Sequence, residues 1–159
     1  MKRVFSLVIF SSFFFLNNHY TFGQTENFKS SNLFGVPGLI DMPAAGSFQD
    51  GQLSFTSSKL GPNLRNTISF QALPRIALSF RYSGIGDKDG GSYSSSGYTY
   101  WDRSFDLRMD LTKESNLIPN LTLGLQDVIG TGLYSAEYLV ASKSFNKRLT
   151  LTGGFGWGR

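Results

Sequence analysis

The sequence predicts an all-β protein, an antiparallel up-and-down β-barrel of the outer-membrane type that this chain leaves incomplete. Three observations support this fold class. Apolar and polar residues alternate along most of the chain after Gly51, with the two-residue period of a β-strand. Short turns alternate with longer glycine-containing connections, as in barrels with periplasmic turns and outer loops. Opposite the large apolar side chains lie mostly small or polar residues, which suits a barrel interior better than a sandwich core.

The first residues have the pattern of an export signal. Lys2 and Arg3 precede an apolar run at 4–16, which is too short to cross a membrane as a helix. Small residues before position 24 favour cleavage after Gly23. We therefore expect a signal peptide at 1–23, an N-terminal periplasmic segment at 24–50 and a β-barrel meander at 51–159.

About seven strands are expected in the meander. They lie at 52–59, 66–72, 75–83, 102–111, 120–128, 136–145 and 148–158. Turns at 73–74 and 146–147 and a polar link at 112–119 join them at one end, and loops at 61–65, 84–101 and 129–135 at the other. Bacterial barrels close with an even number of strands, so an odd number predicts that the chain is part of a longer barrel.

The strand at 103–111 shows where charges should point. Its odd-numbered positions after Arg103 are apolar, and its even-numbered positions are Ser, Asp or Arg. In a barrel the apolar side chains meet lipid and the polar ones face the lumen. The polar side chains expected to face the lumen are Arg81, Asp106, Arg108, Asp110, Gln126, Glu137 and Lys143. They could guide a polar polymer, but charged groups enclosed in small barrels more often pair with each other.

Aromatic residues gather near the loop-side ends of the expected strands. These residues are Tyr82, Tyr100, Trp101, Tyr134, Tyr138 and Trp157. Their placement fits an aromatic girdle at a membrane interface, although aromatic residues also favour strands in general. In the connecting loop, Tyr93, Tyr98, Tyr100 and Trp101 form a candidate carbohydrate-facing group; the competing interpretation is an outer loop with interfacial aromatics.

Composition disfavours several classes of function. The chain has no cysteine, and its one histidine, His19, lies in the expected signal peptide. The commonest general base, metal ligand and nucleophile are therefore missing from the expected mature chain, which predicts no enzyme, cofactor or metal site. Asp87 and Asp89 resemble the start of a calcium loop, but the remaining ligand positions do not match. The charges form no basic stripe, which argues against nucleic-acid binding.

Four stretches carry a family resemblance: "GVPGLIDMPAAGSFQDGQLSF", "RSFDLRMDL", "GLQDVIGTGLYSAEYLVASKSF" and "GGFGWG". They resemble the YjbH-like family of exopolysaccharide biosynthesis proteins, over about 33–158. The resemblance implies an outer-membrane β-barrel of a Gram-negative bacterium, associated with production or export of extracellular polysaccharide or capsule. It supplies no active site. Family members typically have several hundred residues and some are lipoproteins, whereas this chain is short and lacks a lipid-accepting cysteine.

The expected function is a non-catalytic structural or transport component of exopolysaccharide or capsule biosynthesis or export. Its expected partners are outer-membrane lipid, extracellular polysaccharide and other secretion components. The alternative is a secreted soluble β-sandwich that binds carbohydrate through the tyrosine-rich loop. A hydrolase inside the barrel would depend on Asp106, Asp110 or Glu137, and a nucleophile and base set is not recognisable in the sequence.

Overall fold

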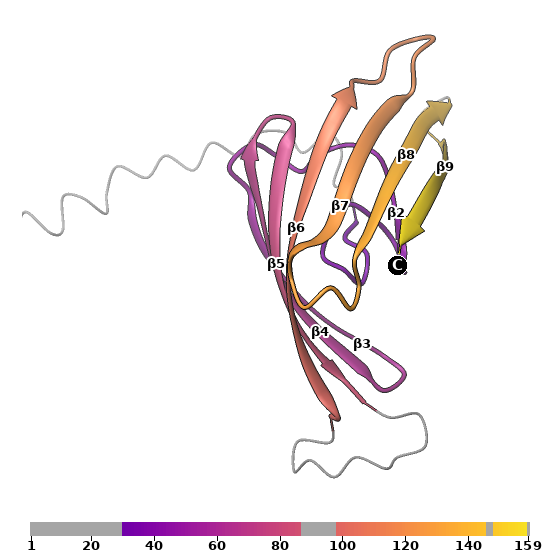
Figure 1. Ribbon diagram of the computed structural model, residues 1–159. Helices are drawn as coiled ribbons and strands as arrows, with labels where there is room; N and C mark the ends of the chain where they lie inside the picture. The colour runs from indigo at the N-terminus through magenta and orange to yellow at the C-terminus, as the bar shows by residue number, and fades with distance from the viewer. Residues whose placement is uncertain (1–29, 87–97, 146–147, 159) are drawn as a thin grey trace, which may run out of the picture.

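The computed structural model describes residues 30–86, 98–145 and 148–158. One large antiparallel sheet of seven strands, in the order β3 to β9, curves into an open half-barrel (Figure 1). Its strands are β3 (Leu53–Leu60), β4 (Asn63–Leu73), β5 (Ile76–Ile85), β6 (Tyr100–Thr112), β7 (Asn120–Gly130), β8 (Ala136–Phe145) and β9 (Leu149–Gly158). Each strand pairs with its neighbours in sequence, which confirms the incomplete up-and-down meander. Among the described residues, no helix is long and apolar enough to cross a membrane.

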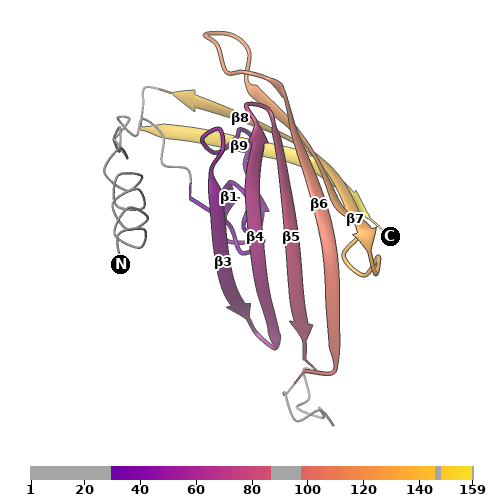
Figure 2. The ribbon, with the colours of Figure 1, turned by 90° about the vertical axis from the view of Figure 1, so that its left-hand side faces the viewer.

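A second, very small sheet lies in the segment before the meander. Here β1 (Gly38–Leu39) pairs with β2 (Met42–Pro43). We call residues 30–50 the inner segment, because they lie within the curve of the large sheet (Figure 2). Side chains of both β4 and β8 hydrogen-bond its backbone. The described part of the expected periplasmic segment is therefore packed into the fold rather than standing apart from it.

The connection between β3 and β4 is shorter than the sequence predicts. The prediction of a loop at 61–65 is wrong. Strand pairing continues to Leu60 and Asn63, which leaves a two-residue turn of Gly61 and Pro62. Gly61 has a φ of +57°, which glycine adopts at little cost. The expected turn at 146–147 lies outside the described residues, as does most of the loop at 84–101.

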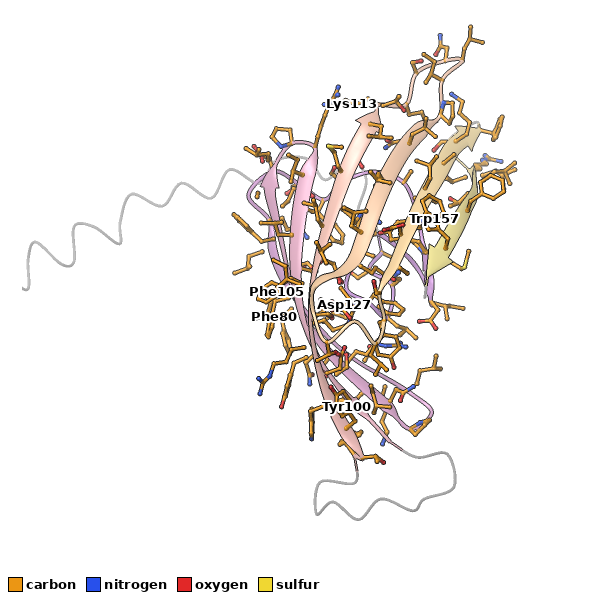
Figure 3. All side chains as sticks on the ribbon, viewed as in Figure 1. Phe80, Tyr100, Phe105, Lys113, Asp127 and Trp157 are labelled. Atoms are coloured by element: carbon orange, nitrogen blue, oxygen red, sulfur yellow. The ribbon has the colours of Figure 1, made fainter. Side chains whose placement is uncertain are left out.

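Burial across the large sheet is the reverse of that in a soluble protein. Bulky apolar side chains such as Phe55 (67% exposed) and Phe155 (81% exposed) lie on its outer, convex face, whereas Arg81 and Asp102 on the concave face are fully buried. Figure 3 shows Phe80 and Phe105 together on one side of β5 and β6, with Asp127 on the other side. Strand alternation produces this division, because successive side chains point to opposite faces.

Candidate functional site

The concave face of the sheet carries most of the buried polar side chains in the described structure. We call it the polar face. Its buried polar members are Arg65, Thr67, Ser69, Gln71, Ser79, Arg81, Ser83, Asp102, Ser104, Asp106, Arg108, Asp110, Thr122, Asp127 and Ser142. They come from five consecutive strands, β4 to β8. In a protein interior such groups are stable only when hydrogen-bonded or paired, so their partners define what the site can do.

Arg81 and Asp106 form an enclosed ion pair at the centre of the polar face. Arg81 Nη1 lies 2.7 Å from Asp106 Oδ2, and Arg81 Nη2 lies 3.3 Å from Asp106 Oδ1. The same Oδ1 accepts the backbone N–H of Asp127 at 2.8 Å. Asp127 has a φ of +54° beside an irregularity in the β6–β7 pairing, which turns its N–H toward Asp106. Three hydrogen bonds thus fix the Asp106 carboxylate.

Arg108 binds the inner segment rather than a carboxylate. Its Nη2 donates to the carbonyl oxygens of Ala44 at 2.5 Å and Gly46 at 3.1 Å, and its Nη1 donates to the Tyr138 hydroxyl at 2.9 Å. One guanidinium thereby connects β6, β8 and the inner segment. Its fork of donors suits this task, because a guanidinium presents several N–H groups in a fixed plane.

Further polar side chains of the sheet hold the inner segment along its length. Gly46 N–H donates to Thr122 Oγ1 at 2.8 Å, and Ala45 N–H donates to Ser142 Oγ at 2.9 Å. The hydroxyl of Ser47 donates to Asp110, which also accepts the Thr122 hydroxyl. The inner segment is therefore attached through its backbone and the Ser47 hydroxyl, at positions spread from β6 to β8.

At the other side of the concavity, Phe34 of the inner segment lies close to two arginines. The guanidinium carbon of Arg65 is 4.2 Å from the centre of the Phe34 ring, and that of Arg81 is 4.9 Å away. Arg65 Nη1 also lies 3.3 Å from Asp41 Oδ1. Attraction between cations and an aromatic face strengthens on desolvation, and here both arginines are buried while Phe34 is half-buried. Phe34 thus anchors the first part of the inner segment.

Some buried polar atoms of the polar face have no protein partner. Both carboxylate oxygens of Asp127, one of Asp102 and the hydroxyls of Ser83 and Ser104 are among them. Such atoms are ordinary binding points for interior water. Over the described ranges, no group of three or more His, Cys, Asp or Glu side chains is placed to hold a metal ion.

The acid and base chemistry considered for Asp106 and Asp110 has no support in this arrangement. Asp106 is bound by Arg81 and the Asp127 N–H, and Asp110 by Ser47 and Thr122. Every one of these contacts holds a carboxylate as an acceptor. The arrangement is suited to holding strands and the inner segment together.

The structure places five of the seven predicted polar residues on the concave side and two on the convex side. The five on the concave side are Arg81, Asp106, Arg108, Asp110 and Gln126. The first four are buried, and Gln126 is half-buried on the same face of β7. Their expected contact with a lumen stays a prediction.

Glu137 and Lys143 were assigned to the wrong face. On β8, Tyr138 and Val140 point inward and form a small apolar cluster with Ala45 of the inner segment. The polar residues between them therefore point outward. Glu137 accepts a hydrogen bond from the Trp157 indole, and Lys143 Nζ lies 3.7 Å from Glu114 Oε1. Polarity alone misidentified the inward positions, because the inner segment supplies a local apolar patch.

The aromatic residues divide in the same way. Tyr82 and Trp101 stack on the outer face with ring centres 4.8 Å apart, and Trp157 lies on the outer face of β9. Tyr138 is buried on the polar face, and Tyr134 lies 5.8 Å from the Arg65 guanidinium carbon, so neither belongs to an outer girdle.

The structure describes three of the four candidate carbohydrate-facing residues, and two of them lie together. Tyr98 contacts Trp101 edge-on, with ring centres 5.1 Å apart, and Trp101 is also stacked on Tyr82. Tyr100 is 47% exposed, and Tyr93 lies outside the described residues. One ring face of Trp101 thus packs on Tyr82, and the carbohydrate-facing role of the four residues stays a prediction.

Sequence reasoning missed the inner segment as part of the site. It is attached mainly through backbone atoms, which no side-chain pattern reports. One available signal was Gly35: it has a φ of +77°, and a Cβ there would lie 2.9 Å from Thr67. A glycine with such close neighbours indicates a segment packed tightly on another element.

Comparisons with known proteins agree with the resemblance seen in the sequence. The family model YjbH, described as "Exopolysaccharide biosynthesis protein YbjH", matches residues 30–159. A protein of Escherichia coli (strain K12) named "Uncharacterized lipoprotein YjbH" is 35% identical over 131 residues, which cover 81% of this chain and 19% of that protein. No solved structure matches. The chain therefore belongs to the YjbH family of exopolysaccharide biosynthesis proteins.

Proposed function

We propose that this chain forms part of an outer-membrane β-barrel that serves exopolysaccharide biosynthesis or export as a non-catalytic structural or transport component. Membership of the YjbH family supports the role in exopolysaccharide biosynthesis. The inverted burial of the sheet supports the membrane setting, because large apolar side chains are outside and charged ones inside. Lipid is the solvent that favours this arrangement, and it is the first partner we propose.

The outer face has the composition and dimensions of a membrane-facing surface. It exposes Leu53, Phe55, Ile68, Phe70, Leu78, Phe105, Met109, Leu111, Leu149, Leu151, Phe155 and Trp157. A contiguous apolar face of this kind marks an interaction with a membrane or with another protein. The strands β3 to β9 have between eight and 13 residues, and tilted strands of about 9–11 residues cross a bilayer.

Amphipathic aromatic residues lie on this face at one end of the sheet. The stacked pair of Tyr82 and Trp101 sits beside the connection from β5 to β6, and Trp157 is near the end of β9. Antiparallel pairing brings these strand ends to the same edge of the barrel. Tyrosine and tryptophan favour the boundary between hydrocarbon and water, so this edge fits a membrane interface.

Two further observations support export to a membrane of a Gram-negative bacterium. The pattern at 1–23 predicts a signal peptide. The relative from Escherichia coli is named a lipoprotein. The chain spans 19% of that relative, so the activity and partners of the whole relative are themselves proposals for this chain.

The position of the inner segment helps to distinguish a structural role of the barrel from a transport role. It fills the concave side between β4 and β8 and is held there by the hydrogen bonds of Arg108, Thr122 and Ser142. A polymer that passed along this wall would have to displace it. In the state described, a structural role or transport along another part of a longer barrel agrees better with the geometry. Polysaccharide and other secretion components remain the proposed partners.

The alternative of a soluble β-sandwich has less support. A sandwich needs a second sheet to cover the apolar face of the first. In the described ranges the only second sheet is the pairing of β1 with β2, and it belongs to the inner segment on the polar face.

Cell fractionation tests the proposal most directly. We expect the tagged protein, in its natural polypeptide, to appear in the outer membrane and to change its gel migration on heating, as closed barrels do. A deletion strain should secrete less exopolysaccharide. Recovery of the protein from the periplasm or the medium would contradict the membrane setting and favour the binding module.

A further inference from the structure

Strand β9 presents a free edge to its surroundings. It pairs with β8 along its whole length, from Leu149 opposite Phe145 to Gly158 opposite Ala136. Each of its described residues is exposed, and no other described strand pairs with it. An unpaired edge offers a row of backbone donors and acceptors to another strand.

The direction of the strands limits what can occupy this edge. In an antiparallel meander of seven strands, β3 and β9 run in the same direction. Their free edges therefore cannot meet in antiparallel pairing. Two copies inserted in the same membrane orientation would have the same difficulty, because the β9 edge of one would meet the parallel β3 edge of the other. This step rests on the proposed membrane setting.

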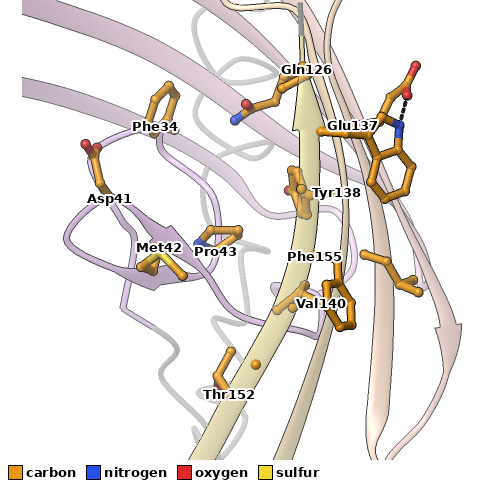
Figure 4. A pocket seen from close by; sticks show the side chains of 17 residues that line it. Phe34, Asp41, Met42, Pro43, Gln126, Glu137, Tyr138, Val140, Thr152 and Phe155 are labelled. Carbon is orange, nitrogen blue, oxygen red and sulfur yellow. Dashed lines mark hydrogen bonds between the residues drawn. The ribbon is translucent and has the colours of Figure 1, made fainter.

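The inward side of β9 also lacks side chains to fill the space beside it. Its inward positions are Thr150, Thr152, Gly154, Gly156 and Gly158, opposite the inward residues of β8. A groove of about 440 Å³ lies along β9 from Thr152 to Gly158, bounded by Phe34, Met42, Pro43, Tyr138 and Val140 (Figure 4). Phe155 projects from the other side of β9 in the same view.

A neighbouring pair of strands shows how such a space is filled in this fold. Gly124 on β7 lies opposite Tyr138 on β8. A Cβ on Gly124 would lie 2.0 Å from Tyr138 Cζ, so the tyrosine ring occupies the volume above the glycine. At Gly156 the nearest atoms to a Cβ are 3.7 Å away, which leaves that volume open.

We propose that the β9 edge binds an antiparallel strand that is not part of residues 30–158 and that places a large side chain over Gly156, as Tyr138 does over Gly124. The strand runs opposite to β9, alternates apolar outward residues with inward ones, and carries its large inward residue into the groove. The strand is supplied by polypeptide that corresponds to the part of the Escherichia coli relative outside the match. This chain covers 19% of that relative, so about four fifths of it lies outside.

The absence of cysteine from the sequence allows a direct labelling test. Gly156→Cys places a single thiol in the groove, and its rate of reaction with a maleimide reagent is measured in the 159-residue chain alone. The measurement is repeated after co-production with the polypeptide that follows the matched 131 residues of the relative. We expect labelling about tenfold slower in the second sample, because a paired edge reacts only after local opening. Lys113→Cys, on an exposed link, should react equally in both.

A pair of glycine substitutions tests the groove itself. Gly156→Trp fills it and should abolish co-purification of the added polypeptide. Gly153→Leu adds an outward side chain where a Cβ meets no atom within 4 Å, and it should leave co-purification unchanged. Equal labelling with and without the added polypeptide would overturn the proposal, as would protection in the chain alone accompanied by a dimer mass. Labelling and co-purification test the pairing of β9 whichever cell fraction contains the protein. Recovery of the protein from the periplasm would contradict only the proposed membrane setting.

Discussion

Asp106 and Leu107 are adjacent on β6, but they lie in opposite kinds of surroundings. Asp106 is buried on the polar face, in an ion pair with Arg81. Leu107 points to the outer face, level with Leu78 and Leu125 of the neighbouring strands. The comparison shows that one strand separates two environments. The outer face would be unfavourable for Asp106, and the polar face would be unfavourable for Leu107. Substitutions on the two faces should therefore fail for different reasons.

The largest effect is expected from Asp106→Asn. The amide keeps an oxygen for the Asp127 N–H but removes the charge that balances the buried Arg81. Breaking a buried ion pair from one side costs about 3–5 kcal/mol, because the remaining charge stays buried and unpaired. Urea unfolding of the detergent-solubilised protein would measure the loss of stability. Asp50→Asn, at an exposed site, is the matched control and should change little. A loss no larger than the control's would contradict an enclosed pair.

The next effect is expected from Leu107→Arg on the opposite face. A cation on the lipid-facing side of a barrel costs about 2–4 kcal/mol near the bilayer midplane. We expect reduced insertion into vesicles, whereas Leu107→Ala keeps an apolar face and should insert well. If the arginine and alanine variants inserted equally, the outer face would not meet lipid, and the inverted burial would need another explanation.

Arg108→Met should act on the inner segment without disturbing the sheet as strongly. The substitution removes the hydrogen bonds to Ala44, Gly46 and Tyr138 but keeps an apolar stem of similar length. We expect a cost of about 1–3 kcal/mol, since the freed carbonyls and hydroxyl lose their partner. Amide hydrogen exchange at 44–48 should become faster, whereas Arg75→Met in an exposed turn should leave it unchanged. Unchanged exchange in both variants would show that Arg108 does not hold the segment.

The alternation of apolar and polar residues was enough to predict most of the fold. It placed each strand of the meander, and on β6 it assigned Asp106, Arg108 and Asp110 to the face where the structure has them. The turn at Gly61 and Pro62 was missed, because the polar residues after it look like a loop but continue the pairing with β3. Local composition does not report how far two strands stay paired.

The candidate site was only partly predictable, because a segment distant in sequence completes it. Ala45 packs on Tyr138 and Val140, which reverses the expected facing of β8 and puts Glu137 and Lys143 outside. Backbone contacts such as those of Gly46 with Thr122 and Arg108 leave no alternating pattern. Sequence periodicity describes one sheet well, but it does not show which face another segment covers.

The smallest effect concerns the link between β6 and β7, where Glu114 contacts the end of β8. The backbone N–H of Ser144 donates to Glu114 Oε1 at 2.7 Å and lowers the pKa of Glu114, and the nearby Lys143 ammonium acts in the same direction. A carboxylate with a lowered pKa in the folded state adds stability above its unfolded pKa, and this is lost as pH falls through the folded pKa. Glu114→Gln should therefore be slightly less stable than the wild type at neutral pH, and this difference should shrink as pH falls through the folded pKa of Glu114. Carbon-13 NMR titration of the Glu114 carboxyl would report the lowered pKa directly. If the stability of the two proteins depended on pH in the same way, the Glu114 contact would add nothing to stability. The stability would then come from the two faces of the sheet and not from the link.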